Sequence, residues 1–256
     1  KTNKLGFDLY LVDINGVLDR EKIYGYDDDA ERFISFQLAV CDWISRWHHK
    51  PDILHCHDHQ AGFIPFFCKH AHAFRYQLAN IPNIFTIHNG QYQGQFSWDK
   101  YYLIPAYDTW NWGYLDWNGL INPMASAVKC AWKVTTVSPN YMEELRQSAA
   151  GLETLFEYEK GKCSGIINGI DSDVWNPATD PYLLKNYDQK TVKSGKAANK
   201  AELMKQFSLD PEKPLISFIG RLVDEKAADL LPEAISQSVY QYGGETSFFV
   251  LGSGDP

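Results

Sequence analysis

Polar residues that could bind a ligand or take part in catalysis follow several short apolar segments of this chain. His88, Asn89 and Gly90 come directly after the apolar run at 84–87, which reads as a buried strand. In an open parallel sheet, ligands bind outside the carboxyl ends of the strands, where such residues are exposed. The same pattern recurs at 53–59, 136–139 and 216–221. Four such strand ends predict one large α/β cleft.

The segment HCHDH at 55–59 invites a metal interpretation, because histidine and aspartate are good Zn²⁺ ligands. On a strand, His55 and His57 would face one way and Cys56 the other. No matching distant ligands accompany them in the sequence. We favour the alternative, in which Asp58 caps a helix starting near Gln60 and faces the cleft, and we expect no metal.

Two cations, Arg221 and Lys226, stand at the end of an apolar strand and about one turn into the next element. Cations there suit a diphosphate whose negative charge grows as a bond to it breaks. The alternative is a solvated surface pair. A glycine turn with Gly252 and Gly254, one βα unit later, favours phosphate contact.

Asn168 and Gly169 follow the strand expected at 163–167, and Asp171 comes two residues later. An Asn-Gly pair is a turn signal by itself, so a turn without functional role is one interpretation. The other interpretation is contact with a ligand in the cleft, which the position just before an expected linker favours.

An aromatic-rich segment at 98–117 shows little periodicity. Its aromatic residues are Trp98, Tyr101, Tyr102, Tyr107, Trp110, Trp112, Tyr114 and Trp117. Aromatic planes stack well on sugar rings, and their polar tips tolerate water. We favour a long loop pinned to the domain by its aromatics and keep carbohydrate contact as the alternative.

Composition sets the broad class. The chain has 256 residues, of which 45% are hydrophobic and 22% charged, which suits one large domain or two smaller ones. A net charge of −8 argues against a basic nucleic-acid surface but not against an anionic small molecule. Five dispersed cysteines indicate a reduced, cytoplasmic setting. The sequence shows neither an apolar run of about 18 residues nor a signal peptide, so no membrane partner is expected.

Strand-like and helix-like segments alternate, which predicts βαβ units and a parallel sheet. Strands are expected at 7–13, 52–55, 83–87, 133–137, 163–167, 215–219 and 247–251. Helices are expected at 28–48, 60–72, 122–132, 138–146, 198–207 and 226–242. Ser138 is expected to be the N-cap of the helix at 138–146, with Pro139 in its first turn. We expect a first domain at 1–176, a linker at 177–197 and a second domain at 198–256. The chain begins without methionine and ends on a glycine turn, which we interpret as an interior fragment.

Several motifs together resemble the bacterial glycogen synthase and plant starch synthase family, in its order and at about its spacing. They are HDHQA at 57–61, TIHNGQYQG at 86–94, VTTVSP at 134–139, INGID at 167–171 with WNP at 175–177, GRL at 220–222 with Lys226, and LGSGDP at 251–256. They cover nearly the whole chain.

The resemblance implies a GT-B architecture, in which two Rossmann-like, doubly wound domains face across a cleft, with the second only partly present here. It implies retaining transfer of glucose from ADP-glucose, or UDP-glucose in some members, to the non-reducing end of an α-1,4-glucan. The partners would thus be a nucleotide sugar and a glucan. Neither a metal nor any cofactor beyond the donor substrate is required. The isolated chain is expected to be inactive.

By the same resemblance, His88 and Asp58 line the donor-sugar pocket, while Arg221 and Lys226 stabilise the leaving diphosphate. Further substrate contacts are implied for Asn89, Tyr92, Gln93, Asn168, Asp171, Gly252 and Gly254.

The chain departs from the family pattern in places. The usual His-Asp-Trp ends in His59, and the usual glycine after Lys226 is Ala227. Because alanine lacks the freedom of glycine at positive φ, we expect that turn to differ slightly. The family's Lys-x-Gly-Gly loop and Glu-x₇-Glu motif fall outside residues 1–256.

Two rival interpretations remain. One is another GT-B enzyme with a different nucleotide sugar, such as a sucrose synthase-like protein, against which the motif at 86–94 argues. The other is a non-catalytic glucan-binding protein, against which the joint presence of Arg221 and Lys226 argues.

Overall fold

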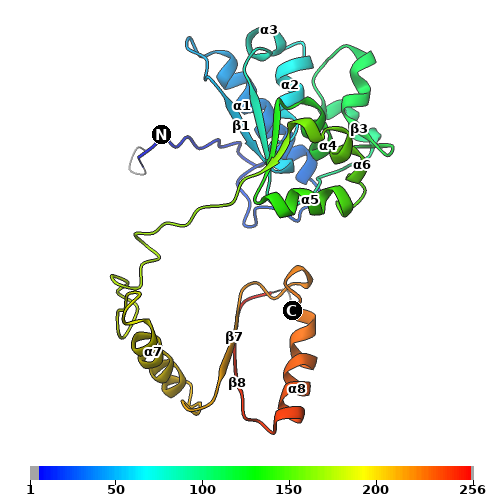
Figure 1. Ribbon diagram of the computed structural model, residues 1–256. Helices are drawn as coiled ribbons and strands as arrows, with labels where there is room; N and C mark the ends of the chain where they lie inside the picture. Colours follow the sequence, from blue (N-terminus) through cyan, green and yellow to red (C-terminus); the bar gives the residue numbers. More distant parts are fainter. Residues whose placement is uncertain (1–5, 255–256) are drawn as a thin grey trace. The chain divides into compact units, whose positions relative to one another are not determined.

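The structure is a computed structural model that describes residues 6–254 (Figure 1). The chain divides into two compact units, residues 1–169 and residues 170–256. The expected first domain ended at residue 176, and the expected domain organisation of the whole protein stays a prediction.

The first unit is built on a four-stranded parallel sheet. Its strands are β1 (Leu54–His57), β2 (Asn83–Ile87), β5 (Lys133–Thr136) and β6 (Cys163–Gly165), in the order β1-β2-β5-β6. In register, His57 pairs with Thr86, and Ile87 pairs with Thr136. The carboxyl ends of β1, β2 and β5 therefore lie at one edge, and the predicted Rossmann-like α/β class is confirmed.

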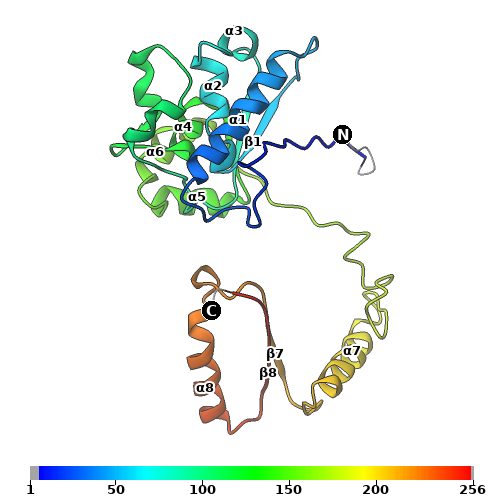
Figure 2. The ribbon, with the colours of Figure 1, turned by 180° about the vertical axis from the view of Figure 1, so that it is seen from behind.

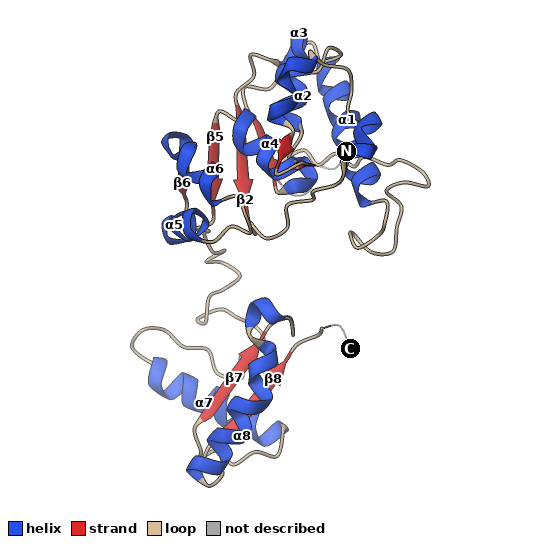
Figure 3. Cartoon of the chain, turned by 90° about the vertical axis from the view of Figure 1, so that its right-hand side faces the viewer, coloured by secondary structure: helices blue, strands red, loops and turns tan. Residues whose placement is uncertain are grey.

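Helices pack around this sheet, as Figure 3 shows. They are α1 (Asp29–Ser45), α2 (Ile64–His70), α3 (Arg75–Leu78), α4 (Pro123–Cys130), α5 (Pro139–Gln147) and α6 (Glu153–Tyr158). Helix α1 packs against α2 (Figure 2). Short 3₁₀ helices η1 (His59–Ala61), η2 (Trp98–Leu103), η3 (Thr109–Tyr114) and η4 (Lys160–Lys162) and an antiparallel pair, β3 (Asp116–Trp117) and β4 (Leu120–Ile121), complete the unit.

A single apolar core holds the sheet and helices of the first unit together. Phe63, Phe66 and Phe67 come from the start of α2 and from α2 itself, and Phe85 comes from β2; all four are fully buried. Complete burial of side chains of this size contributes about 1.5–3 kcal/mol each relative to exposure. The core thereby fixes β1 and β2 in register, and with them the residues that follow each strand.

Two helices of the first unit begin with side-chain caps. Ser138 accepts a hydrogen bond from the backbone N–H of Tyr141 at the start of α5, as the sequence predicts. Asn122 does the same for Ala125 at the start of α4. Each helix then has a proline in its first turn, where no N–H is missed. Such caps contribute about 1 kcal/mol each, and the one at Ser138 fixes where α5 begins after β5.

Among the expected elements of the first unit, the strand at 7–13 and the helix at 60–72 differ most from the structure. The strand expected at 7–13 is reduced to a single β-bridge residue, Leu9, and Leu11 is 83% exposed. The helix expected at 60–72 is divided into η1 and α2. Pro65 explains the late start of α2, since proline fits the first turn of a helix and not its interior.

The second unit contains one βαβ arrangement. β7 (Leu215–Ile219) and β8 (Ser247–Leu251) are parallel neighbours with the predicted bounds, and α8 (Leu231–Tyr242) connects them after two 3₁₀ turns, η5 (Asp224–Lys226) and η6 (Ala228–Leu230). Helix α7 (Val192–Gln206) precedes them and begins six residues before the predicted position 198. Gly195 permits this early start, because a Cβ there would lie 2.3 Å from Cβ of Tyr187.

Candidate functional site

Asp58 and His88 meet at the carboxyl edge of the first sheet, although 30 residues separate them in the sequence. The Asp58 backbone N–H donates to the carbonyl oxygen of Thr86 at 3.0 Å, which extends the β1–β2 pairing by one residue. The Asp58 Oδ1 atom accepts a hydrogen bond from the His88 backbone N–H at 2.8 Å. The side chain of His88 is thus held at an exposed strand end.

Asp58 has a backbone conformation that is rare outside glycine, with φ 54° and ψ −179°. Such a residue costs about 1–3 kcal/mol and persists where its surroundings hold it in place. The conformation turns the carboxylate toward His88, so the predicted cap on the following helix is wrong: η1 begins without a side-chain hydrogen bond from Asp58. The strained conformation of Asp58 thus accompanies the hydrogen bond that joins the ends of β1 and β2.

His57 is a neighbour of His88 that the prediction did not include among the site residues. Its Nδ1 atom lies 3.0 Å from Nε2 of His88, so one ring donates a hydrogen bond and the other accepts it. The rings of His55 and His57 lie 4.2 Å apart, and Cys56 is buried, as the alternation along a strand predicts.

The electrostatics of the histidine pair favour a neutral His57. Partial desolvation holds the pKa of His57 below its ordinary value, and the rings of His55 and His88 lower this pKa further. A neutral ring has one nitrogen that donates and one that accepts. The arrangement therefore orients the His88 ring by a hydrogen bond and adds no fixed positive charge from His57.

The loop after His88 contains both exposed and buried side chains. Tyr92 is 52% exposed, while the Oδ1 atom of Asn89 accepts a hydrogen bond from the Gln91 backbone N–H. Gln93 is 5% exposed, and its Nε2 atom donates to the carbonyl oxygens of residues 149 and 150. Its Oε1 atom accepts from Asn122. The structure thus gives Gln93 a role in holding the loop, and its contact with a substrate stays a prediction.

Gly94 ends this loop close to the histidine segment. Its φ is +68°, and a Cβ atom there would lie 2.3 Å from Cδ2 of His59. Both the conformation and the space require glycine at this position. His59, which stands where the family usually has tryptophan, therefore packs directly against the backbone of the loop that carries Tyr92.

The Asn-Gly turn lies at the boundary of the two units. Asn168 is exposed after β6, in the first unit, and Asp171 belongs to the second. The Oδ1 atom of Asp171 accepts hydrogen bonds from the backbone N–H groups of Asp173 and Val174, at 3.0 and 3.1 Å. Asp171 thus shapes its own turn, and substrate contact by either residue stays a prediction.

Arg221 and Lys226 are exposed and follow β7 in the second unit. The Nη2 atom of Arg221 lies 3.6 Å from Oε2 of Glu225, an exposed ion pair of small energetic weight. Neither cation is buried in an internal interaction that would occupy it structurally. Contact of the two cations with a diphosphate stays a prediction.

The glycine turn after β8 lies against the Arg221 segment. The Leu222 backbone N–H donates to the Ser253 carbonyl oxygen at 2.9 Å. A Cβ atom at Gly252 would lie 2.1 Å from the Gly220 carbonyl oxygen, and one at Gly254 would lie 2.3 Å from that of Leu222. Glycine is therefore required at both positions for the two loops to run side by side, and contact of this turn with a phosphate stays a prediction.

Ala227 keeps the left-handed conformation that glycine favours, with φ 54° and ψ 34°. For an L-residue this conformation costs roughly 1–2 kcal/mol. With alanine in place of the family's usual glycine, the backbone of this turn stays in the region that glycine favours. The expected effect of the alanine is therefore a lower stability of the turn.

Within residues 6–254, no group of three or more histidine, cysteine, aspartate and glutamate side chains is placed to hold a metal ion. In the same range, no helix is long and apolar enough to span a membrane.

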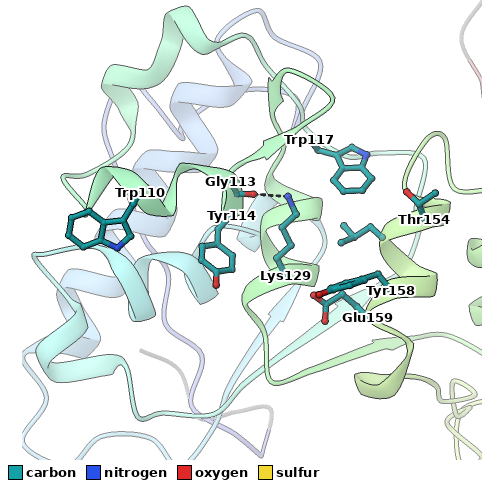
Figure 4. A pocket seen from close by; sticks show the side chains of 9 residues that line it. Trp110, Gly113, Tyr114, Trp117, Lys129, Thr154, Tyr158 and Glu159 are labelled. Atoms are coloured by element: carbon teal, nitrogen blue, oxygen red, sulfur yellow. Dashed lines mark hydrogen bonds between the residues drawn. The ribbon is translucent and has the colours of Figure 1, made fainter.

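A second feature of the first unit is a pocket of about 410 Å³ (Figure 4). It is lined by Trp110, Gly113, Tyr114, Trp117, Lys129, Thr154, Leu155, Tyr158 and Glu159. The aromatic segment at 98–117 signalled part of it in the sequence. The sequence did not indicate that residues of α4 and α6 also line the pocket, because their pattern there is that of ordinary amphipathic helices.

The fold and the strand-end residues define the class: a Rossmann-like α/β protein with a polar site at the carboxyl ends of its parallel strands. The model of the starch synthase catalytic domain matches residues 1–158. The chain belongs to this family of glycosyltransferases.

Among curated proteins, the chain is similar to bacterial glycogen synthases. It is 48% identical to the glycogen synthase of Flavobacterium johnsoniae over 99% of this chain and 54% of that protein. It is 40% identical to the glycogen synthase of Exiguobacterium sibiricum over 98% of this chain and 53% of that protein. The chain thus spans about half the length of the curated relatives it matches.

A solved structure agrees with both the family and the fold. The catalytic domain of starch synthase IV from Arabidopsis thaliana, bound to ADP and acarbose, matches with a TM-score of 0.79 and 33% identity. The match covers 93% of this chain and 49% of that one. The Rossmann-like assignment therefore extends over nearly all of the chain.

Proposed function

We propose that the whole protein is a retaining glucosyltransferase that moves glucose from ADP-glucose to the non-reducing end of an α-1,4-glucan. The observation that carries this proposal is the joining of His88 to Asp58 at the strand edge of a starch synthase catalytic domain. The glycogen synthase relatives and the plant relative bound to ADP and acarbose support a nucleotide and a carbohydrate as ligands.

In this proposal His88 and Asp58 line the pocket of the donor sugar, with Asn168 and the loop at 89–93 nearby. Asp58 fixes the backbone of His88, and His57 orients its ring. Such preorganisation keeps the polar groups in place before the donor binds, so little reorganisation is needed during the reaction.

Arg221 and Lys226 would stabilise the diphosphate as the bond from the sugar to its phosphate oxygen breaks. Negative charge grows on the leaving group in that step, and cations placed beforehand lower the barrier. The backbone of Gly252 and Gly254 would approach the same group, since glycine leaves that loop without side-chain bulk. The acceptor hydroxyl would attack from the face that the diphosphate leaves, which retains the anomeric configuration.

The test is glucose transfer onto glycogen by the whole protein, from ADP-glucose and UDP-glucose in parallel. We expect transfer with ADP-glucose and a loss of at least about 100-fold in kcat for Arg221→Ala. Arg46→Ala is the matched control, since Arg46 is an exposed arginine directly after α1 that pairs with Asp42.

Other outcomes would replace the proposal. Transfer from a different nucleotide sugar alone would indicate another glycosyltransferase of this architecture. Binding of glycogen with no transfer from either donor by the folded protein would indicate a non-catalytic glucan-binding protein.

A further inference from the structure

We propose that the aromatic pocket of the first unit binds a segment of an α-1,4-glucan chain at a place separate from the strand-end site (Figure 4). This inference rests on the proposed function, which supplies a glucan as the acceptor. It adds a second point of contact for that polymer.

The volume and the lining residues of the pocket are those of a binding site for a small ligand. Its volume of about 410 Å³ lies in the range of roughly 300–1,000 Å³ that holds small ligands. Leu155, which is 3% exposed, is an apolar lining residue anchored in the core. Trp110 and Tyr158 are 77% and 84% exposed, so their ring surfaces are open to a ligand.

Lys129 holds the walls of the pocket together. Its Nζ atom donates to the carbonyl oxygens of Gly113 at 2.8 Å and Asp116 at 2.6 Å, and it lies 5.0 Å from the ring centroid of Trp117. The Nε1 atom of Trp117 donates to the carbonyl oxygen of Gly151 at 2.8 Å. The wall formed by η3 and β3 is therefore fixed before any ligand arrives, which reduces the entropy lost on binding.

The chemistry of the lining favours a neutral carbohydrate. A sugar ring offers C–H faces, which pack on aromatic planes, and hydroxyl groups, which need polar partners. The lining supplies both, with Trp110, Tyr114 and Tyr158 as planes and with Thr154 and Glu159 as hydrogen-bonding groups. These are the partners that one face of a glucan segment requires.

An anionic ligand fits the pocket less well. The ammonium group of Lys129 already bonds two carbonyl oxygens, and the carboxylate of Glu159 lies in the lining. Glu159 is paired with Lys162 at 3.0 Å, outside the lining. A diphosphate would therefore meet a carboxylate and a cation that is already engaged, whereas a hydroxyl group donates to the carboxylate and accepts from the ammonium group.

The pocket lies away from the proposed donor site. Lys129 is near the end of α4, four residues before the first residue of β5, and Glu159 is four residues before the first residue of β6. Both are thus near the amino ends of the sheet, while His88 and Asp58 follow carboxyl ends. A four-residue strand spans about 13 Å, so the two sites are at opposite ends of the strands.

Two points of contact on one polymer raise the effective concentration of its chain ends at the second site. The pocket should therefore lower the apparent KM for glycogen, a long acceptor that reaches both sites. It should leave the KM for maltose unchanged, because a disaccharide occupies one site at a time.

The test compares the double variant Trp110→Ala/Tyr158→Ala with Tyr76→Ala, a matched control because Tyr76 is 80% exposed and lies outside the lining. Binding of the full protein to glycogen is measured by affinity electrophoresis, and binding of maltoheptaose by calorimetry. We expect the double variant to bind glycogen about tenfold more weakly or worse, and Tyr76→Ala to bind as the unchanged protein does.

Circular dichroism verifies that the variants are folded, and Tyr158→Phe, which keeps the ring, should retain most of the binding. Equal glycogen binding by the double variant and the unchanged protein would overturn the inference even if transfer is normal. Loss of binding in the double variant would support it even if neither donor is used. The inference and the proposed function thus fail separately.

Discussion

The backbone N–H of His88 lies 2.8 Å from Oδ1 of Asp58, and this hydrogen bond joins the ends of two parallel strands. Asp58 makes it from a backbone conformation that L-residues rarely adopt. The hydrogen bond stabilises the fold and the strained backbone destabilises it. Substitutions at Asp58 can therefore measure the two contributions separately.

We predict that Asp58→Gly is more stable than Asp58→Ala by about 1–3 kcal/mol, because glycine adopts φ 54° and ψ −179° without strain. Both variants lose the bond to His88, so both should lose activity in the transfer assay. Urea unfolding gives the free energies. Equal stability of the two variants would show that Asp58 is unstrained.

Gln93 should matter for folding more than for substrate contact. Gln93→Ala removes hydrogen bonds to residues 149 and 150 and from Asn122, and leaves buried polar groups without partners. We predict a loss of about 1–3 kcal/mol in the free energy of unfolding. Gln91→Ala, at an exposed position two residues earlier, is the control. If Gln93→Ala unfolds like the unchanged protein but binds the donor more weakly, direct contact is the better explanation.

Ala227→Gly should stabilise the second unit by about 0.5–1 kcal/mol, since glycine relieves the left-handed conformation at a smaller entropic cost. Ala228→Gly is the adjacent control: Ala228 has no positive φ, so glycine there should destabilise. Thermal unfolding of both variants measures the difference. A lower melting temperature for Ala227→Gly would contradict the prediction.

His70 should make stability depend on pH. Burial, and then the nearby charge of Lys69, lowers the pKa of His70 from its ordinary 6.5 to about 4. Its Nε2 atom is buried without a hydrogen-bond partner, and its ring stacks on Tyr114. The unfolded chain takes up a proton near pH 6.5 and the folded chain only near pH 4. The free energy of unfolding therefore falls as the pH drops through this window.

The measurement for His70 is the melting temperature between pH 7 and pH 4. We predict a flatter dependence on pH for His70→Gln than for the unchanged protein, even though the variant loses ring stacking. Gln91→Ala, at an exposed uncharged residue, should keep the original slope. Parallel curves for all three proteins would rule out His70 as the source.

The sequence by itself predicted the features that depend on local pattern. Alternating burial placed His55 and His57 on one face, Ser138 was predicted as a helix cap, and the bounds of β7 and β8 were predicted to the residue. The order of the motifs predicted the family. These features follow from the preferences of neighbouring residues, which the sequence displays directly.

Only the tertiary structure decided which residues meet. It turned Asp58 toward His88 and away from the helix, and it buried Gln93 beneath its loop. It reduced the strand expected at 7–13 to one bridge residue, and it assembled the aromatic pocket from segments at 110–117, 129 and 154–159. Contacts between distant segments depend on how helices and strands pack around the whole core, and no local pattern contains that information.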